Sequence, residues 1–146
     1  MPTIAPMQLE MLKPGLRHTQ SIVVDEHLTV PAVSRAFTGF ADMPEVFATA
    51  FLVGFVEWTC IEALKPLLPA GTQTVGVHVD LSHNSATPVG MRVTAEVTLA
   101  EVEGRRLVFH VRCRDEVDLI CEGVHERALI DGAKFRARVA RKQGAA

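Results

Sequence analysis

Hydrophobic residues along the chain change their spacing near residue 71, from the spacing of a helix to that of strands. Residues 46–64 are apolar on nearly every side, as in a helix that other structure surrounds. An acidic cap, an early proline and an early acidic residue in 42–45 predict where this helix begins. We expect it to run to about Lys65, because the proline- and glycine-containing segment 66–71 ends it.

Beyond residue 71, apolar and polar residues alternate, which is the pattern of half-buried strands. One apolar face, which we expect to pack on the long helix, comprises Val75, Val77, Val79 and Leu81. Similar runs predict strands over residues 17–24, 91–99, 107–113 and 119–130. Short turns join the last four strands, so the sheet should be antiparallel. The pattern predicts an α+β fold in which a curved antiparallel sheet of about five strands wraps one long helix.

The size of the chain fits one domain over residues 1–146, with flexible ends at 1–16 and 142–146. Hydrophobic residues make up 48% of the chain, which argues against disorder. A net charge of -2 gives no electrostatic case for binding nucleic acid. The one basic cluster, in residues 134–142, is interpreted as a solvated end or as a contact for a phosphate group.

Cysteine usage and the apolar segments bear on the location of the protein. Three widely spaced cysteines without a CxxC pair favour reduced thiols and a cytoplasmic protein. No signal peptide is predicted, because the first 25 residues lack its order of basic and then apolar residues. No membrane span is predicted either, because Thr49, Gly54 and Glu57 interrupt the longest apolar stretch. We expect no metal and no cofactor.

Glu57 is the first residue that suggests chemistry, because it lies within the most apolar helical segment. A carboxylate that loses its water must be paired, hydrogen-bonded or neutralised. Such a residue costs stability, so a functional role is a serious explanation for it. The alternative is a glutamate that merely reaches a polar rim of the helix.

His83 and Thr49 are predicted to lie near the same helix. His83 shares the parity of the apolar face of its strand, although a histidine at a strand end can also be structural. Thr49 lies near the helix start, where free N–H groups can bind an oxyanion, although its hydroxyl can also bond back to its own helix. Eight residues separate Thr49 from Glu57, a rise of about 12 Å. A shared site therefore needs an irregular helix start or two chains.

Four blocks of sequence carry a resemblance to a known family. They are PEVFATAFLVGFVEWTC at 44–60, HNSATPVG at 83–90, VEGRRL at 102–107 and GVHERA at 123–128. Together they resemble the fluoroacetyl-CoA thioesterase group of hotdog-fold proteins, in the same order and spacing from about residue 17 to 140. The match is specific because the Glu-Trp pair, the turn after His83 and the His-Glu-Arg string occur together.

The resemblance implies a hotdog homodimer, with its site at the subunit interface, that cleaves a short or small acyl-CoA thioester to free acid and coenzyme A. It implies that the catalytic residues are Thr49, Glu57 and His83 and that the residues of the acyl pocket and its lid include Gly76, Arg127 and Phe40. The family's second lid phenylalanine falls on Met43. That departure weakens the case for fluoroacetyl selectivity and leaves thioester hydrolysis in place.

The roles of these residues, and three other functions, stay open at this point. Glu57 would be a nucleophile that forms an acyl anhydride, or a base toward water. The phosphates of coenzyme A have basic candidates in Arg105, Arg106 and the C-terminal arginines. The alternatives are a dehydratase-type hotdog enzyme, an acyl-carrier-protein thioesterase and a non-catalytic hotdog module that binds an acyl-CoA or a small carboxylic acid. The complete set of Thr49, Glu57 and His83 argues against the binding module.

Overall fold

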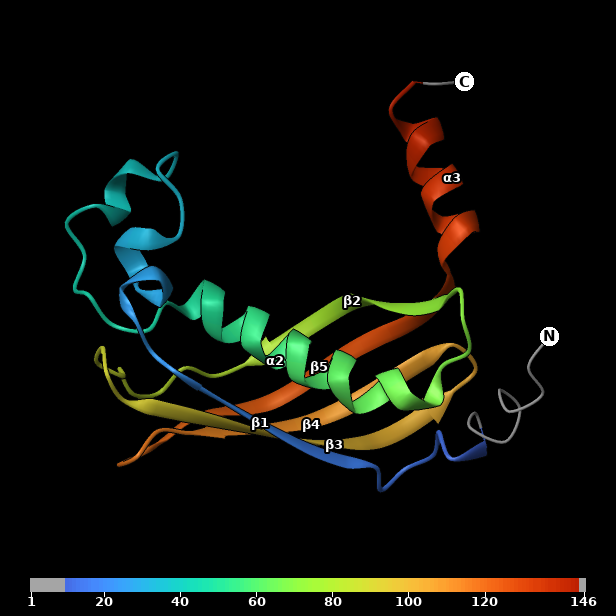
Figure 1. The fold of residues 1–146 in the computed structure, drawn as a ribbon, viewed down its shortest axis with the longest axis horizontal. Helices are drawn as coiled ribbons and strands as arrows, with labels where there is room; N and C mark the ends of the chain where they lie inside the picture. The colour runs from blue at the N-terminus through green and yellow to red at the C-terminus, as the bar shows by residue number, and fades with distance from the viewer. Residues whose placement is uncertain (1–9, 145–146) are drawn as a thin grey trace.

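Five antiparallel strands curl around one long helix in the computed structural model, which describes residues 10–144 (Figure 1). The helix is α2 (Thr49–Leu64), and the sheet order is β1-β3-β4-β5-β2. The strands are β1 (Arg17–Val23), β2 (Thr72–Leu81), β3 (Arg92–Glu103), β4 (Arg106–Arg114) and β5 (Leu119–Asp131). This arrangement confirms the α+β prediction of a helix wrapped by a curved five-stranded sheet.

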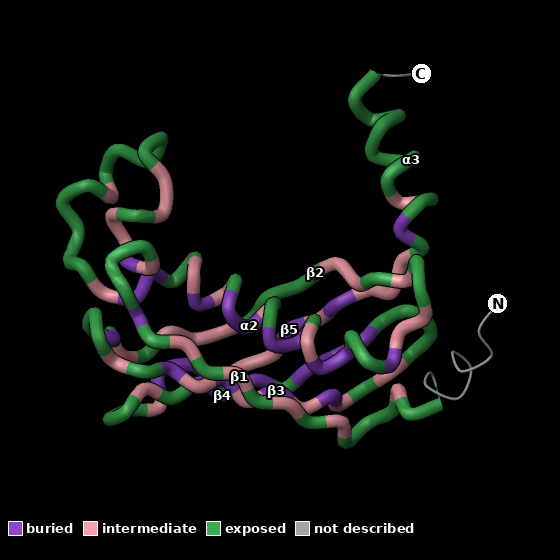
Figure 2. The backbone as a smooth tube through the Cα atoms, in the orientation of Figure 1, coloured by how far each residue is buried: buried purple, intermediate pink, exposed green. Residues whose placement is uncertain are grey.

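The core lies between α2 and the concave face of the sheet (Figure 2). Strand β3 alternates as predicted, since Val93, Ala95, Val97 and Leu99 are fully buried while the residues between them face outward. On the helix, Val56, Cys60 and Leu64 are fully buried against this face. The period-2 pattern therefore positions the sheet correctly around the buried side of α2.

The predicted start of the helix is wrong. The helix begins at Thr49, and its N-cap, Ala48, makes no side-chain capping bond. The backbone before it is extended and paired on both sides: Phe47 N donates to Thr87 O and Ala48 N donates to Leu28 O. These long-range bonds outweigh the local start signal in 42–45. The spacing of hydrophobic residues along the sequence gives no information about such bonds. The predicted end is confirmed, because η4 (Lys65–Leu67) follows Leu64 directly.

The prediction that the helix is covered on all sides is wrong for one stripe of α2. Gly54, Trp58 and Ile61 are exposed, and 38% of the Glu57 side chain is accessible. These positions follow one another at the three- and four-residue spacing of a single helix face. A single chain therefore leaves an apolar stripe of its central helix uncovered, with one carboxylate in the middle. We call Gly54, Glu57, Trp58 and Ile61 the open stripe.

The predicted inward face of β2 is wrong before the bulge and uncovered after it: Gly76 itself faces Glu57 of α2, and Val79 lies opposite the buried His125. The register with β5 shifts between Gly76 and His78, so one extra residue interrupts the alternation. Val77 and Val79 are 56% and 45% exposed instead of packing on α2. Strand β2 forms one edge of the sheet and has β5 as its single partner among the strands. The edge strand beside the open stripe is thus apolar and uncovered.

Two arms rise from opposite ends of the sheet, on the side where α2 lies (Figure 1). One is the segment 24–48, with the short helices η1 (Glu26–Leu28), η2 (Val30–Ala32) and η3 (Thr38–Phe40). The other is α3 (Gly132–Lys142), which the sequence pattern did not predict. Its N-cap Asp131 accepts a hydrogen bond from Lys134 N. Aspartate is a preferred N-cap residue, so Asp131 could have indicated the start of this helix. Of the expected flexible ends, residues 1–9 and 145–146 lie outside the described residues.

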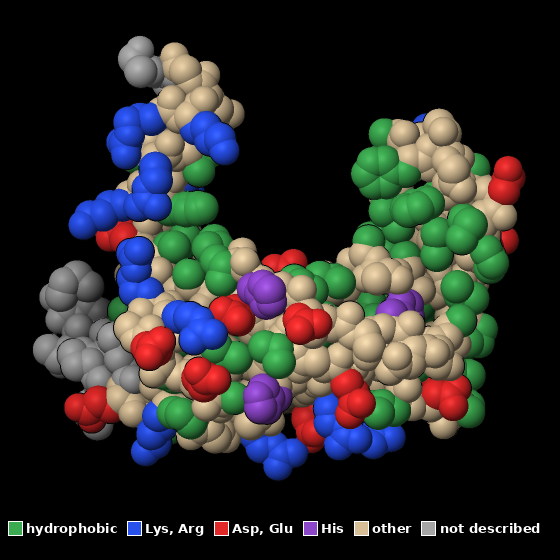
Figure 3. Space-filling model, turned by 180° about the vertical axis from the view of Figure 1, so that it is seen from behind, with side chains coloured by type: hydrophobic (Ala, Val, Ile, Leu, Met, Phe, Trp, Pro, Cys, Tyr) green, Lys and Arg blue, Asp and Glu red, His purple; other side chains and the backbone are tan. Residues whose placement is uncertain are grey.

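A deep hollow separates the arms in the space-filling view (Figure 3). Hydrophobic side chains gather on the arm 24–48, whereas lysines and arginines gather on α3. Among residues 10–144, no helix is both long and apolar enough to cross a membrane.

Candidate active site

Two polar clusters lie along α2, one at its first residue and one about two turns further on. The first joins Thr49 to His83, and the second joins Glu57 to Arg127. Within residues 10–144, no hydrogen bond or ion pair connects one cluster with the other. The predicted catalytic residues therefore fall into two groups, separated by about 12 Å of helix rise.

The Thr49 cluster combines a hydroxyl, an imidazole and the start of a helix. Thr49 Oγ1 lies 2.8 Å from His83 Nδ1, so the threonine bonds to the histidine and not back to its own helix. The backbone N–H groups of the first helical turn lack partners within the helix, and they form the positive end of the helix dipole. These groups could bind a carbonyl oxygen that gains negative charge.

His83 is suited to proton transfer at neutral pH. It follows the end of β2, where the turn is held by Asn84 N donating to Ile120 O. Burial lowers the pKa of His83 from its ordinary value of 6.5, which favours the neutral imidazole. Its Nε2 atom is buried and has no hydrogen-bond partner among the described residues. A cavity of about 240 Å³ adjoins the ring and is lined by Val30, Val46, Phe47, Thr49, His83, Asn84, Ser85 and Ala86.

The second cluster holds the Glu57 carboxylate in a fixed direction. Arg127 Nη1 donates to Glu57 Oε1 at 3.0 Å. Arg127 is itself only 2% exposed, and its guanidinium is anchored by Thr74, whose hydroxyl and carbonyl oxygens accept bonds at 2.8 and 3.0 Å. A buried arginine with this many bonds cannot swing away from the carboxylate, so it orients Glu57 within the open stripe.

His125 completes this cluster, and its hydrogen bonds fix its protonation. Arg127 can only donate, so His125 Nε2 must accept its bond at 3.0 Å. The carbonyl oxygen of His78 can only accept, so His125 Nδ1 carries the proton at 2.9 Å. Burial, together with the charge of Arg127, lowers the pKa of His125 and agrees with a neutral ring. The sequence analysis missed Thr74 and His125, although His125 lies two residues from Arg127 on the same strand face.

We predict that His125 makes the protein less stable in mild acid. Its pKa is lowered in the folded state, so the stability is full above the ordinary histidine pKa of 6.5 and is lost as the pH falls below it. The free energy of unfolding, measured with urea from about pH 8 to about pH 5, should fall less steeply for His125→Asn than for wild type. His110→Asn changes an exposed histidine of β4 and serves as the control. Parallel pH curves for wild type and His125→Asn would contradict the assignment.

Gly76 lies against the Glu57 carboxylate. A Cβ atom at Gly76 would stand 2.7 Å from Glu57 Oε1 and 3.4 Å from Arg127 Nη1. The distance to Glu57 Oε1 is too short for any ordinary contact. The absence of a side chain at position 76 therefore leaves the room that the Glu57–Arg127 pair occupies.

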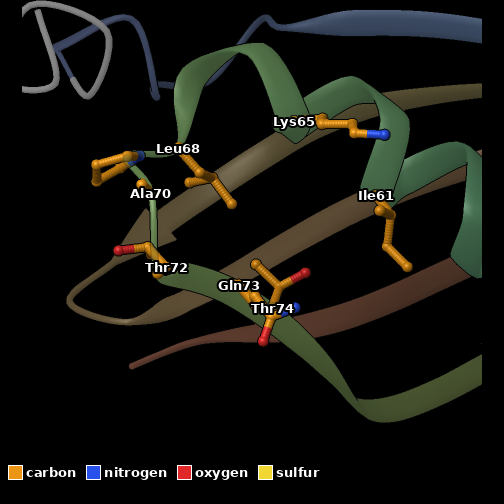
Figure 4. A pocket seen from close by; sticks show the side chains of 9 residues that line it. Ile61, Lys65, Leu68, Ala70, Thr72, Gln73 and Thr74 are labelled. Carbon is orange, nitrogen blue, oxygen red and sulfur yellow. The ribbon is translucent and has the colours of Figure 1, made fainter. Parts of the chain in front are cut away.

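A second cavity adjoins this cluster (Figure 4). It has a volume of about 340 Å³ and is lined by Ile61, Lys65, Leu68, Pro69, Ala70, Gly71, Thr72, Gln73 and Thr74. Ile61 lies one helical turn beyond Glu57, and Thr74 holds Arg127. The cavity thus lies between the start of β2 and the last turn of α2, and it meets the Glu57 cluster at Thr74.

Phe40 and Met43 lie on the arm 24–48, which runs directly into the start of α2. The ring of Phe40 packs edge-on against Phe37, with centroids 5.7 Å apart. Met43 is 47% exposed. The two predicted lid residues therefore belong to the end of the molecule that carries Thr49.

Other reactive groups near α2 do not offer an alternative chemistry. Cys60 is fully buried, and this burial raises its pKa to about 12, so its thiol stays protonated. In the part of the chain that the structure describes, no three His, Cys, Asp or Glu side chains form a group that could hold a metal ion. Glu57 is therefore the strongest candidate for a nucleophile or base on this helix.

Comparison with known proteins assigns the family. The sequence model of the fluoroacetyl-CoA-specific thioesterase family matches residues 24–133. The chain belongs to this family. A fluoroacetyl-CoA thioesterase from Streptantibioticus cattleyicolor is 44% identical over 131 residues, which cover 90% of this chain and 94% of the relative.

Two solved structures support the family and the fold. A threonine-to-serine mutant of the fluoroacetyl-CoA protein FlK, in complex with acetyl-CoA, is 43% identical with a TM-score of 0.87 and covers 89% of this chain and 98% of its own. A hot-dog-like protein from Thermanaerovibrio acidaminovorans is 26% identical with a TM-score of 0.75 and covers 88% of this chain and 91% of its own. The hotdog fold is thus confirmed, and the chain is an acyl-CoA thioester hydrolase.

Proposed function

We propose that this protein hydrolyses the thioester of a small acyl-CoA at a site built from two copies of the chain. Glu57, held by Arg127 of one subunit, would face Thr49 and His83 of the partner subunit. The position of Glu57 in an uncovered apolar stripe of the central helix carries this proposal. A carboxylate with a fixed direction and no cover in its own chain is suited to a site that a second copy completes.

The open stripe and strand β2 form a surface that suits a second copy of this chain. Trp58 and Ile61 are 42% and 39% exposed on the stripe, and Val77 and Val79 extend the apolar surface onto β2. Strand β2 also has an unpaired edge, which soluble proteins normally cover. A two-fold axis beside β2 would pair the edges and set the two α2 helices antiparallel. The start of one helix would then lie beside Glu57 of the other.

We predict that Ile61→Asp yields an inactive monomer. The change places a carboxylate in the apolar centre of the proposed interface, where its desolvation opposes association. Analytical ultracentrifugation should show half the wild-type mass, and thioester hydrolysis should fall with it. Val117→Asp serves as the control because Val117 is 75% exposed in the turn before β5. An active Ile61→Asp monomer would contradict the two-subunit site.

The reaction then follows from the groups on each side. The Glu57 carboxylate either attacks the thioester carbon and forms an acyl anhydride, or removes a proton from an attacking water. Thr49 and the helix-start N–H groups of the partner subunit bind the carbonyl oxygen as it gains charge. Collapse of the tetrahedral intermediate breaks the C–S bond and releases the coenzyme A thiolate. His83 positions the water in both routes. In the anhydride route its neutral imidazole takes a proton from the water that attacks the anhydride, and cleavage of the anhydride releases the free acid and restores the Glu57 carboxylate.

The acyl group is expected to be small. The cavity beside Thr49 and His83 measures about 240 Å³, and the arm with Phe40 and Met43 stands at the same end. Because Met43 replaces the second lid phenylalanine of the family, we expect no preference for fluoroacetyl-CoA over acetyl-CoA. The free thiols of the three cysteines fit the reducing cytoplasm that we expect for this enzyme.

Thiol release from a panel of acyl-CoAs, from acetyl to aromatic, tests the proposed function. We expect turnover of the small acyl groups and a marked fall in kcat/KM as the acyl group grows. The panel includes the same acyl groups on an acyl carrier protein, because both thioester classes would use one site. Absence of turnover with every thioester, together with measurable acyl-CoA binding, would instead indicate a non-catalytic binding module.

A further inference from the structure

Helix α3 is a strongly basic arm that its own domain barely covers. It carries five cations and no acid, on a chain whose net charge is -2. Three of these cations, Lys134, Arg138 and Arg141, lie at the spacing of one helix face. Among residues 10–144, no carboxylate lies within ion-pair distance of any of the five. The arm therefore presents positive charge that the described part of the chain leaves unneutralised.

The base of this arm is fixed at the rim of the cavity of about 340 Å³ that adjoins the Glu57 cluster. Gly132 N donates to Gly71 O at 2.9 Å, and Arg136 Nη2 donates to Gln73 Oε1 at 3.3 Å. Both Gly71 and Gln73 line that cavity, as does the ammonium-bearing Lys65 (Figure 4). From this base, α3 extends about 16 Å away from the sheet. Positive charge thus continues outward from the cavity mouth along one direction.

We propose that α3 binds the phosphate groups of the coenzyme A moiety while the pantetheine chain passes through the cavity of about 340 Å³ toward Glu57. This inference rests on the proposed thioesterase function. The cavity supplies an apolar path beside Ile61 and Leu68, which suits a flexible, largely neutral chain. The arm supplies arginines, whose planar forks bind phosphate oxygens in pairs.

The structure also argues against one of the other basic candidates. Arg106 Nε donates to Glu126 at 2.8 Å, and its Nη1 lies 3.6 Å from Glu101 and 3.8 Å from Glu103. Three nearby carboxylates neutralise this guanidinium and would repel a phosphate group. The α3 cations have no such competitors, which makes them the better site.

A comparison of two substrates tests the arm in the full-length dimer. Acetyl-CoA contains the phosphates, whereas S-acetylpantetheine offers the same thioester without them. For Arg138→Ala/Arg141→Ala, the ratio of kcat/KM for acetyl-CoA to that for S-acetylpantetheine should fall about tenfold. The matched control is Arg112→Ala/Arg114→Ala, which removes two exposed arginines from the outer face of β4 and should leave the ratio within about twofold of wild type.

Calorimetric titration with coenzyme A alone gives a readout that does not need turnover. We expect the dissociation constant to rise about tenfold in the α3 variant and to keep its wild-type value in the control. If the α3 variant matches the control in both experiments, the phosphate assignment is overturned. If wild type hydrolyses neither substrate but the α3 variant still weakens coenzyme A binding, the proposed hydrolysis fails and the phosphate site stands.

Discussion

Glu57→Gln should lower kcat/KM for a small acyl-CoA by about 10³-fold or more while the protein stays folded. The amide keeps the size of the carboxylate, and its oxygen can still accept the bond from Arg127. It has no negative charge with which to attack a thioester carbon or to take a proton from water. Thiol release under kcat/KM conditions measures the loss, and the thermal midpoint reports on folding.

Glu62→Gln provides the matched control for that measurement. Glu62 lies five residues further along α2 and pairs with Lys65 across 3.9 Å near the helix end. The same chemical change there should leave kcat/KM within about twofold, because a surface ion pair contributes little. Wild-type turnover in Glu57→Gln would show that this carboxylate takes no part in the chemistry.

Gly76→Ala should lower kcat/KM by about 100-fold with little change in stability. The added methyl group would stand 2.7 Å from Glu57 Oε1, so the carboxylate must move. That movement is easy, because the atom in contact is the end of a flexible side chain. It also removes the carboxylate from the position where Arg127 holds it, and a displacement of this size is costly for catalysis. Activity and the free energy of unfolding should both be measured.

Gly123→Ala is the contrasting variant on the neighbouring strand. Gly123 has a φ of 152°, and a Cβ atom there would collide with the Asp80 carbonyl oxygen of β2. Backbone cannot move aside as a side chain can, so we expect a loss of about 2 kcal/mol or more in unfolding free energy. If Gly76→Ala instead loses stability as Gly123→Ala does, position 76 is structural and the argument about the carboxylate fails.

Local periodicity predicted the parts of this fold that one chain buries by itself. The fully buried residues of β3 and the sheet-facing side of α2 follow the predicted pattern, because burial within the chain sets their spacing. The failures have a different physical origin. Phe47 and Ala48 are held extended by bonds to distant segments, and a bulge after Gly76 places Gly76 on the inward face that was predicted for Val75 and Val77.

The candidate site residues came from two sources. The positions of Glu57, His83 and Thr49 in the sequence made them candidates, and the resemblance added Gly76 and Arg127. No pattern within the chain indicated Thr74, which reaches the site only because β2 pairs with β5. The all-round apolar character of α2 is also informative, since the part that one chain leaves exposed is the part that a second copy would bury.

Subunit mixing tests the two-subunit site most directly. Glu57→Gln and His83→Ala dimers are each expected to be inactive. In a mixed dimer, Glu57 of the His83→Ala subunit would face His83 of the partner subunit, which restores one intact site. Exchange at equal amounts should therefore recover about a quarter of wild-type activity, since about half of the dimers are mixed. Mixed dimers that form, as native mass spectrometry would show, but have no more activity than the two parents would contradict the account.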